Sequence, residues 1–311
     1  MNKKKLKIGT RASPLALIQA EIVKQKICKI HNLPNDMVEI IAMSTKGDRL
    51  TDQPLTEIGG KGLFTEEIEQ ALRDQQIDMA VHSCKDLPPF DPIDLSCKIF
   101  LKRENRSDAF ISNKTNKFTN LPYGAIVGTS SARRRALIKH YRPDLNVVTL
   151  RGNVHTRLQK LNNQQIDATF LAYAGLIRLN IANLATEIMD DHYFPPAPAQ
   201  GVIAVQTRIN DKETLTLLEA IADITTTYEI MAERAFTKHL GGSCRTAIAA
   251  LSTIYNNELS FMGILLSPDG NYKYSTYVTG NVNDAILIGK SAANNLRNQV
   301  GENFFETWQN N

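Results

Sequence analysis

The amino-acid sequence predicts an α/β protein, because short β-like runs alternate with amphipathic helical segments along most of the chain. The length of 311 residues exceeds that of one ordinary hydrophobic core and indicates two or three domains. From about Thr225 the order changes to a long helix, three β-like runs and a closing helix. We therefore expect α/β architecture followed by a small α+β domain.

Two comparable series of elements come before that change. The first begins with a strand at 6–9 and a helix that Ser13 caps, with Pro14 in its first turn. Its remaining elements are expected at 38–43 (strand), 64–73 (helix) and 79–82 (strand). The second series has strands at 125–127, 146–150 and 168–171, each followed by a helix.

A proline-rich stretch at 194–198 is typical of a crossing between domains. The strand expected next, at 202–206, could return to the first sheet rather than start a new one. In the last part, a helix at 226–239 leads into a turn at 241–244. Three β-like runs near Ala247, Leu259 and Tyr272 then come before a closing helix at 284–299.

Charge and cysteine content exclude several classes of protein. The net charge of only +4 does not favour a general polyanion binder. The four cysteines contain no C-x-x-C pair, so we expect reduced thiols and a cytoplasmic location. The N-terminus lacks the apolar region of a signal peptide, and no apolar run approaches the ~18 residues that span a bilayer. We expect no metal, since Cys28/His31 and His82/Cys84 read as structural pairs.

Two segments share a design suited to binding anions. In 128–135 and in 150–157, a strand ends, a polar residue caps a helix, and arginines lie at the strand end or in the first helical turn. Helix N-termini offer free N–H groups, and arginine binds carboxylates bidentately. Adjacent helical residues diverge by ~100°, so Arg133, Arg134 and Arg135 cannot all face one pocket. We expect Arg135 to face water.

Three further segments carry reactive or flexible residues. Lys85 and Asp86 follow a strand end, where ligands of α/β sheets gather. The segment 59–64 lacks the glycine spacing of a phosphate-binding loop. We therefore expect a flexible loop there that could act as a lid. Cys244 lies on a tight turn beside Arg245, a cation that favours the nucleophilic thiolate.

Taken together in order, these segments closely resemble the hydroxymethylbilane synthase (porphobilinogen deaminase) family over residues 6 to 250 or so. The matching segments are 10–17 (TRASPLAL), 59–64 (GGKGLF), 80–86 (AVHSCKD), 128–131 (GTSS) with Arg133 and Arg134, and 150–157 (LRGNVHTR).

The resemblance implies a three-domain protein whose first two domains are lobes like those of periplasmic binding proteins. The implied boundaries are 1–101 plus 200–220, 105–196, and 224–311. It also implies a transferase of heme (porphyrin, tetrapyrrole) biosynthesis that joins four porphobilinogen molecules head to tail and releases ammonia. The primer would be a dipyrromethane held through a thioether on Cys244. Such an enzyme would be a cytoplasmic monomer that binds neither nucleic acid nor membrane.

The resemblance also assigns roles to individual residues. Asp86 matches the catalytic aspartate, which would stabilise the azafulvene-like cation left by ammonia. The implied cofactor-binding residues are Cys244, Lys85, Ser83, Thr129, Ser130, Ser131, Arg133, Arg134, Arg151 and Gly152. The implied substrate-binding residues are Arg11, Ser13, Arg157, Gln200, Lys61 and Phe64. Arginines that repel one another when the site is empty would be stabilised by a chain of carboxylates.

Several positions depart from the family pattern. Ser243 stands where a second glycine is usual, Ala247 replaces a common proline, and Ala199 replaces the glycine before Gln200. A two-lobed, non-catalytic anion-binding protein is the alternative, but it leaves Asp86 and Cys244 without roles. A nucleic-acid binder is less favoured, because the basic residues lack interleaved aromatic residues.

Overall fold

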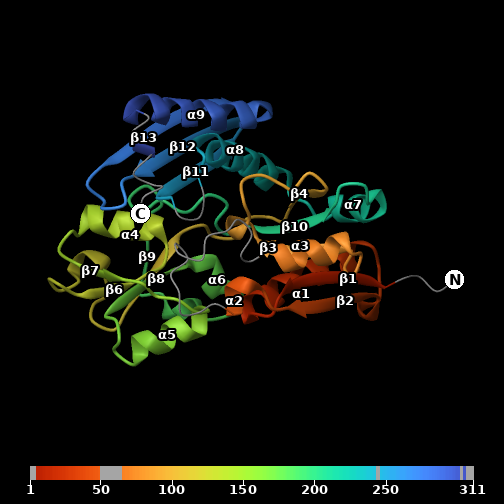
Figure 1. The fold of residues 1–311 in the computed structure, drawn as a ribbon, viewed down its shortest axis with the longest axis horizontal. Coiled ribbons are helices and arrows are strands. Elements are labelled where there is room, and N and C mark those ends of the chain that lie inside the picture. The colour runs from red at the N-terminus through yellow and green to blue at the C-terminus, as the bar shows by residue number, and fades with distance from the viewer. Residues whose placement is uncertain (1–4, 50–64, 243–245, 302–303, 306–311) are drawn as a thin grey trace. The chain divides into compact units, whose positions relative to one another are not determined.

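The computed structural model describes residues 5–49, 65–242, 246–301 and 304–305. They form two compact units (Figure 1). The first contains the described residues up to 49, residues 65–104 and residues 201–227, and the second contains 105–200 and the described residues from 228 onward. The chain thus passes from the second unit back to the first after Gln200, just beyond the predicted proline-rich crossing.

The first unit is built on a five-stranded sheet of order β2-β1-β3-β10-β4. Strands β1 (Leu6–Arg11), β2 (Val38–Met43) and β3 (Met79–Ser83) are parallel. Strand β10 (Ile203–Arg208) lies antiparallel between β3 and β4 (Leu95–Phe100). The strand after the crossing therefore does return to the first sheet.

Helices pack on both faces of this sheet. Helix α1 (Pro14–Ile30) shares a core with Val81, whereas α3 (Glu66–Arg73) shares one with the neighbouring Ala80. Consecutive strand residues point to opposite faces, so α1 and α3 cover opposite sides of the sheet. Helices α2 (Lys46–Arg49) and α7 (Lys212–Glu219) also belong to the first unit.

The second unit contains a similar five-stranded sheet of order β7-β6-β8-β5-β9. Its strands are β5 (Asp108–Ser112), β6 (Ile126–Gly128), β7 (Asn146–Val148), β8 (Ala168–Ala172) and β9 (Glu187–Ile188). Strands β6, β7 and β8 are parallel, and each is followed by a helix: α4 (Ala132–Tyr141), α5 (Val154–Asn162) and α6 (Tyr173–Arg178).

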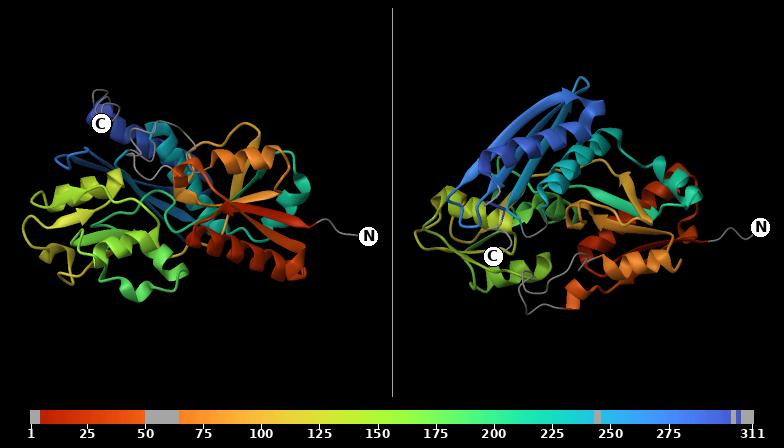
Figure 2. Two further views of the ribbon diagram at one scale, coloured as in Figure 1. Left: turned by 60° about the horizontal axis from the view of Figure 1, so that its bottom comes forward. Right: turned by 45° about the horizontal axis from the view of Figure 1, so that its top comes forward.

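A three-stranded antiparallel sheet forms the rest of the second unit (Figure 2). Its strands are β11 (Ile248–Tyr255), β12 (Glu258–Leu266) and β13 (Lys273–Asn281), and α8 (Ile224–Leu240) and α9 (Ala285–Val300) pack on it. Phe236 of α8 and Ile288 of α9 belong to the hydrophobic core on one face of this sheet. Ala249 and Ile264 of the sheet belong to a different core, which includes Phe110 of β5. The two sheets are thus joined by hydrophobic packing, and the division into separate domains at 105–196 and 224–311 stays a prediction.

Short 3₁₀ helices complete the element order at η1 (Asn35–Met37), η2 (Cys84–Asp86), η3 (Phe118–Asn120), η4 (Ala182–Leu184) and η5 (Val282–Asp284). The predicted fold class, two α/β lobes with a small α+β part, is confirmed. The sequence prediction omitted β4, β5, β9 and α7. No helix in the described ranges is both long and apolar enough to cross a membrane.

Ala199, which replaces a family glycine, has a left-handed backbone with φ of 62°. This conformation costs a residue with a Cβ atom about 1–2 kcal/mol. Glycine removes that cost, but it also makes the unfolded chain more flexible, which offsets part of the gain in stability. We expect Ala199→Gly to stabilise the protein by about 0.5–1 kcal/mol in urea unfolding. The control is Ala185→Gly, where φ is −66° and the same change should destabilise. A loss of stability in Ala199→Gly would show that its methyl group matters more than its backbone strain.

Candidate active site

In the first unit, the predicted site residues lie at the carboxyl edge of the parallel strands. Arg11 ends β1, Ser83 ends β3, and Lys85 and Asp86 form the 3₁₀ turn that follows. Ser13 caps α1 by accepting a hydrogen bond from the Ala16 N–H at 3.4 Å. Because β1 and β3 run parallel, these residues are brought to one edge of the sheet.

A pocket opens at this edge. Its lining includes Arg11, Ser13, Thr65, His82, Ser83 and Asp86. The Asp86 carboxylate is exposed, and the Ser83 hydroxyl donates to the Gln19 side chain at 3.0 Å. Asp86 is the acidic residue among the described residues that line the pocket. The pocket therefore combines a cation, a carboxylate and several hydroxyl groups.

His82 forms part of the pocket wall and is only 6% exposed. Burial lowers the pKa of His82 to about 4, the nearby Arg11 cation adds to the shift, and the Gln206 side chain opposes it. The imidazole is therefore neutral near pH 7. This residue was predicted to be structural, as half of a pair with Cys84, and its place in the pocket was not foreseen.

In the second unit, hydroxyl groups gather where β6 ends and α4 begins. Ser131 caps α4 by accepting from the Arg134 N–H at 3.3 Å, and the Thr129 hydroxyl accepts from the Ser131 N–H at 3.2 Å. The Ser130 hydroxyl donates to the Leu150 carbonyl at 2.6 Å, which ties this turn to the neighbouring loop. The start of α4 is thus held in a defined conformation with its first N–H groups at the carboxyl edge of the sheet.

The loop after β7 presents the second predicted arginine pair. Gly152 has φ of 111°, and a Cβ there would lie 2.8 Å from the Thr156 side chain, so glycine is required. Arg157 donates from Nε to the Gly152 carbonyl at 2.8 Å, and Asn153 caps α5. Arg151 and Arg157 are both half-buried. Because β6 and β7 are parallel, this loop and the start of α4 lie at the same edge.

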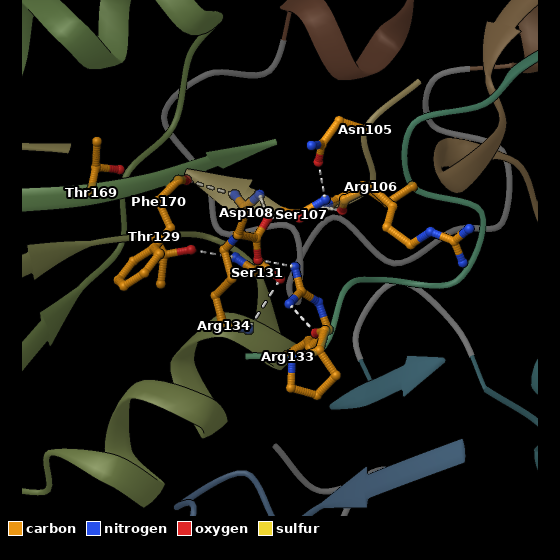
Figure 3. Close-up of polar contacts among 12 residues, drawn as sticks. Asn105, Arg106, Ser107, Asp108, Thr129, Ser131, Arg133, Arg134, Thr169 and Phe170 are labelled. Carbon is orange, nitrogen blue, oxygen red and sulfur yellow. Dashed lines mark hydrogen bonds and ion pairs between the residues drawn. The ribbon is translucent and has the colours of Figure 1, made fainter. Parts of the chain in front are cut away.

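Arg133 and Arg134 converge on one buried carboxylate (Figure 3). Arg133 donates to Asp108 Oδ2 at 2.7 Å and to the Pro195 carbonyl, also at 2.7 Å. Arg134 donates to Asp108 Oδ1 at 2.6 Å and to the Phe170 carbonyl at 2.7 Å. Gln200 also donates to Asp108 Oδ1, at 2.9 Å. This network joins β5, α4, β8 and the segment that leads to the crossing.

The Asp108 network changes the interpretation of three predicted positions. Arg133 and Arg134 direct their terminal nitrogens at protein groups. In each guanidinium the buried Nε has no hydrogen-bond partner among the described residues. Gln200, predicted to bind substrate, is fully buried against Asp108. The prediction that Arg135 faces water is wrong: it is half-buried and donates to the Val147 carbonyl at 2.9 Å. The polar backbone of the neighbouring strand gives this third arginine a partner.

The donors in the second unit fit an acidic ligand such as a dipyrromethane. Hydroxyl groups, helix starts and half-buried arginines are the groups that carboxylates prefer. Cys244, Lys61 and Phe64 lie outside the described residues. Cys84, the other thiol near a predicted site, is 1% exposed and so is poorly placed to carry a bulky group.

Two family models together match nearly the whole chain. "Porphobilinogen deaminase, dipyromethane cofactor binding domain" matches residues 6–216. The chain belongs to the porphobilinogen deaminase family. The model for the C-terminal domain of porphobilinogen deaminase matches residues 227–298 and agrees with this assignment. The family resemblance noted from the motifs is thereby confirmed.

A curated relative in the porphobilinogen deaminase family is the porphobilinogen deaminase of Nitrobacter hamburgensis. It is 45% identical over 298 residues, covering 96% of this chain and 94% of the relative. Solved structures similar to this chain include the VFT2 domain of BvgS from Bordetella pertussis, 18% identical with a TM-score of 0.43, covering 75% of this chain and 91% of that one. Another is a periplasmic substrate-binding protein of an ABC transporter from Coxiella burnetii, 17% identical with a TM-score of 0.43, covering 73% of this chain and 94% of that one.

Three polar residues near the predicted deaminase site were not foreseen as parts of it: Asp108, Thr65 and His82. Asp108 could have been suspected because it is an acidic residue directly before the apolar run 109–111. His82 stands inside the quoted motif 80–86, yet its neighbours do not reveal that its Nε2 atom is buried without a partner. Thr65 gives no signal in the sequence beyond its position before a helix.

Proposed function

We propose that this protein is a transferase that joins four porphobilinogen molecules head to tail into hydroxymethylbilane and releases ammonia, in tetrapyrrole (heme) biosynthesis. The observation that carries the proposal is the 45% identity to a porphobilinogen deaminase over 96% of the chain. The pocket of the first unit supports it, because it presents a carboxylate, a cation and hydroxyl groups at one sheet edge.

Asp86 is the proposed catalytic residue. When ammonia leaves, the substrate's pyrrole ring and methylene carbon carry a positive charge, which a neighbouring carboxylate stabilises. Lys85, half-buried in the same turn, and Arg11 and Ser13 in the pocket then bind carboxylates of the substrate and of the growing chain.

The second unit supplies the remaining proposed carboxylate ligands. Arg151 and Arg157, with the hydroxyls of Thr129, Ser130 and Ser131, surround two helix starts at one sheet edge. Arg133 and Arg134, predicted to bind the cofactor, are proposed to act on it chiefly as positioning residues that fix the start of α4 through Asp108. Gln200 is proposed to act through the same carboxylate, since its amide donates to Asp108.

A dipyrromethane attached to Cys244 is the proposed cofactor, with Ser83, Lys85 and Gly152 among its neighbours. When bound, it supplies the nucleophilic pyrrole end from which the chain grows. Lys61 and Phe64 are proposed to contact substrate. The protein is further proposed to be a cytoplasmic monomer of three domains that does not bind nucleic acid or membrane.

Denaturing mass spectrometry tests the cofactor assignment. The purified holoprotein is expected to carry the added mass of one dipyrromethane, located by peptide mapping on the peptide that contains Cys244. A protein purified without the group should gain it on incubation with porphobilinogen, and Cys244→Ser should not. Modification of a peptide containing Cys84, or no modification after reconstitution, would contradict the proposed attachment site.

A further inference from the structure

Two polar side chains in the pocket of the first unit have no role in the proposal so far, Thr65 and His82. Both are buried, with exposures of 2% and 6%. Within the part of the chain that the structure describes, Thr65 Oγ1 and His82 Nε2 each lack a hydrogen-bond partner. A buried polar atom without a partner destabilises a protein, and such atoms are rare in native folds. Two of them in the wall of one pocket therefore indicate a function outside the protein's own packing.

Thr65 is the residue directly before α3, the position where a threonine hydroxyl ordinarily caps a helix. Here its side chain makes no capping hydrogen bond, with φ of −127° and ψ of −25°. The hydroxyl is therefore not used by the helix that it precedes. Its capacity to donate a hydrogen bond is therefore unused within the described residues, and Thr65 lines the pocket.

His82 belongs to a buried polar group on the α3 side of the sheet. It lies two residues after Ala80, which packs against α3, so the two side chains point to the same face. On β10, Gln206 donates to Glu69 of α3 at 3.2 Å. The Gln206 side chain also lies close enough to His82 to oppose the lowering of its pKa, but neither Gln206 Oε1 nor His82 Nε2 has a hydrogen bond of normal geometry within the described residues. His82 in the pocket wall and Gln206 beside it thus have hydrogen-bonding capacity that the described protein groups do not satisfy.

The charges around the pocket indicate which ligand group lies deepest. The Arg11 cation is close enough to His82 to disfavour a positive charge on the imidazole, so the surrounding field favours an anion. Asp86, in contrast, is exposed and favours a cation. Porphobilinogen carries both kinds of group, since its ring bears two carboxylates and an aminomethyl group that is protonated at neutral pH.

We propose that Thr65 and His82 bind a carboxylate of the pyrrole substrate at the inner end of this pocket, with the aminomethyl group toward Asp86. The inference rests on the proposed function and adds two specificity-determining residues to it. The Thr65 hydroxyl and one imidazole N–H donate to the carboxylate oxygens. The ligand then satisfies atoms that the protein leaves without partners.

Thr65→Val tests the inference because it removes the hydroxyl and keeps the shape. In the reconstituted holoenzyme, KM for porphobilinogen should rise about tenfold, the effect of one lost hydrogen bond to a charged group. The value of kcat should change less than about twofold, since the contact is made equally in ground and transition states. Thr65→Ser should restore KM. The melting temperature of Thr65→Val should rise, because an unsatisfied buried hydroxyl is gone.

Thr207→Val is the matched control, since Thr207 Oγ1 is also buried with no partner in the described ranges but does not line the pocket. Its melting temperature should rise while KM stays unchanged. His82→Gln, which keeps a side-chain donor, should raise KM less than His82→Phe. An unchanged KM in Thr65→Val, beside normal wild-type turnover, overturns the inference alone. Absence of hydroxymethylbilane formation by the wild-type holoenzyme contradicts the proposed function and this inference together.

Discussion

Asp86→Asn is expected to lower turnover of porphobilinogen at least about a hundredfold while the protein keeps its fold and its cofactor. The substitution removes the negative charge but keeps the size and hydrogen-bonding shape of the side chain. Asp86 is the acidic residue that lines the pocket among the described residues, so no other carboxylate there replaces it. Steady-state formation of hydroxymethylbilane measures the loss, and denaturing mass spectrometry measures the retained cofactor.

Because the loss of turnover in Asp86→Asn is expected to come from the lost negative charge alone, the control must remove a carboxylate charge elsewhere in the same unit. Asp36→Asn makes the same chemical change at an exposed position in η1 of the same unit and should leave turnover unchanged. A merely structural role for Asp86 would lower the melting temperature along with the rate, whereas a catalytic role lowers the rate alone. Turnover within about threefold of wild type would contradict the catalytic assignment, because a catalytic charge is worth far more.

The sequence was most informative where alternating or helical hydrophobic patterns were long and ended at polar residues. The strand at 38–43 has the predicted bounds, and the site segments at 83–86 and 128–131 do follow strands β3 and β6. Strand β9 was missed because it has only two residues, too few to show a period. Strand β5 has the same length as the predicted β8, but it begins with an aspartate, a residue that is uncommon in strands. Strand β4 was missed since its buried pattern has one exposed position and so lacks alternation.

The part of the site that could not be predicted depends on contacts between distant residues. Helical geometry correctly separates Arg135 from its neighbours, but it cannot reveal that Arg133 and Arg134 both reach Asp108, 25 and 26 residues earlier. Adjacent helix residues point in different directions, but an arginine side chain is long enough for both to reach the same carboxylate. Each arginine binds a different oxygen of it. Likewise, the lack of partners at Thr65 and His82 is a property of packing, which no local motif encodes.

Asp108 is fully buried, and its carboxylate is the shared partner of two buried guanidinium groups. Burial by itself raises the pKa of Asp108, but the charges of Arg133 and Arg134, with hydrogen bonds from Arg134 and Gln200, lower the pKa well below its ordinary value of 3.8. The network therefore stabilises the folded protein fully above about pH 4, and this contribution is lost as the pH falls through the lower, folded-state pKa.

Asp108→Leu is expected to destabilise the protein by about 3–5 kcal/mol, because it removes the carboxylate that pairs with two buried cations. For the same reason Arg133→Leu is expected to lower stability as well as cofactor assembly, whereas Arg151→Leu is expected to affect the site alone. The control is Asp94→Asn, which removes an ion pair to Arg73 of the same 2.6 Å length but with exposures of 45% and 32%.

Solvent screening makes the exposed pair worth less than about 1 kcal/mol, so urea unfolding at pH 7 should separate the two variants clearly. Below pH 4 the difference between Asp108→Leu and wild type should shrink, because wild type loses the stabilisation that the variant already lacks. A similar small loss in both variants would show that burial does not strengthen the Asp108 network. Arg133 and Arg134 lie in the first turn of α4. A large loss of stability in Asp108→Leu alone would therefore indicate that Asp108 fixes the start of α4, where the second unit is proposed to bind its acidic ligand.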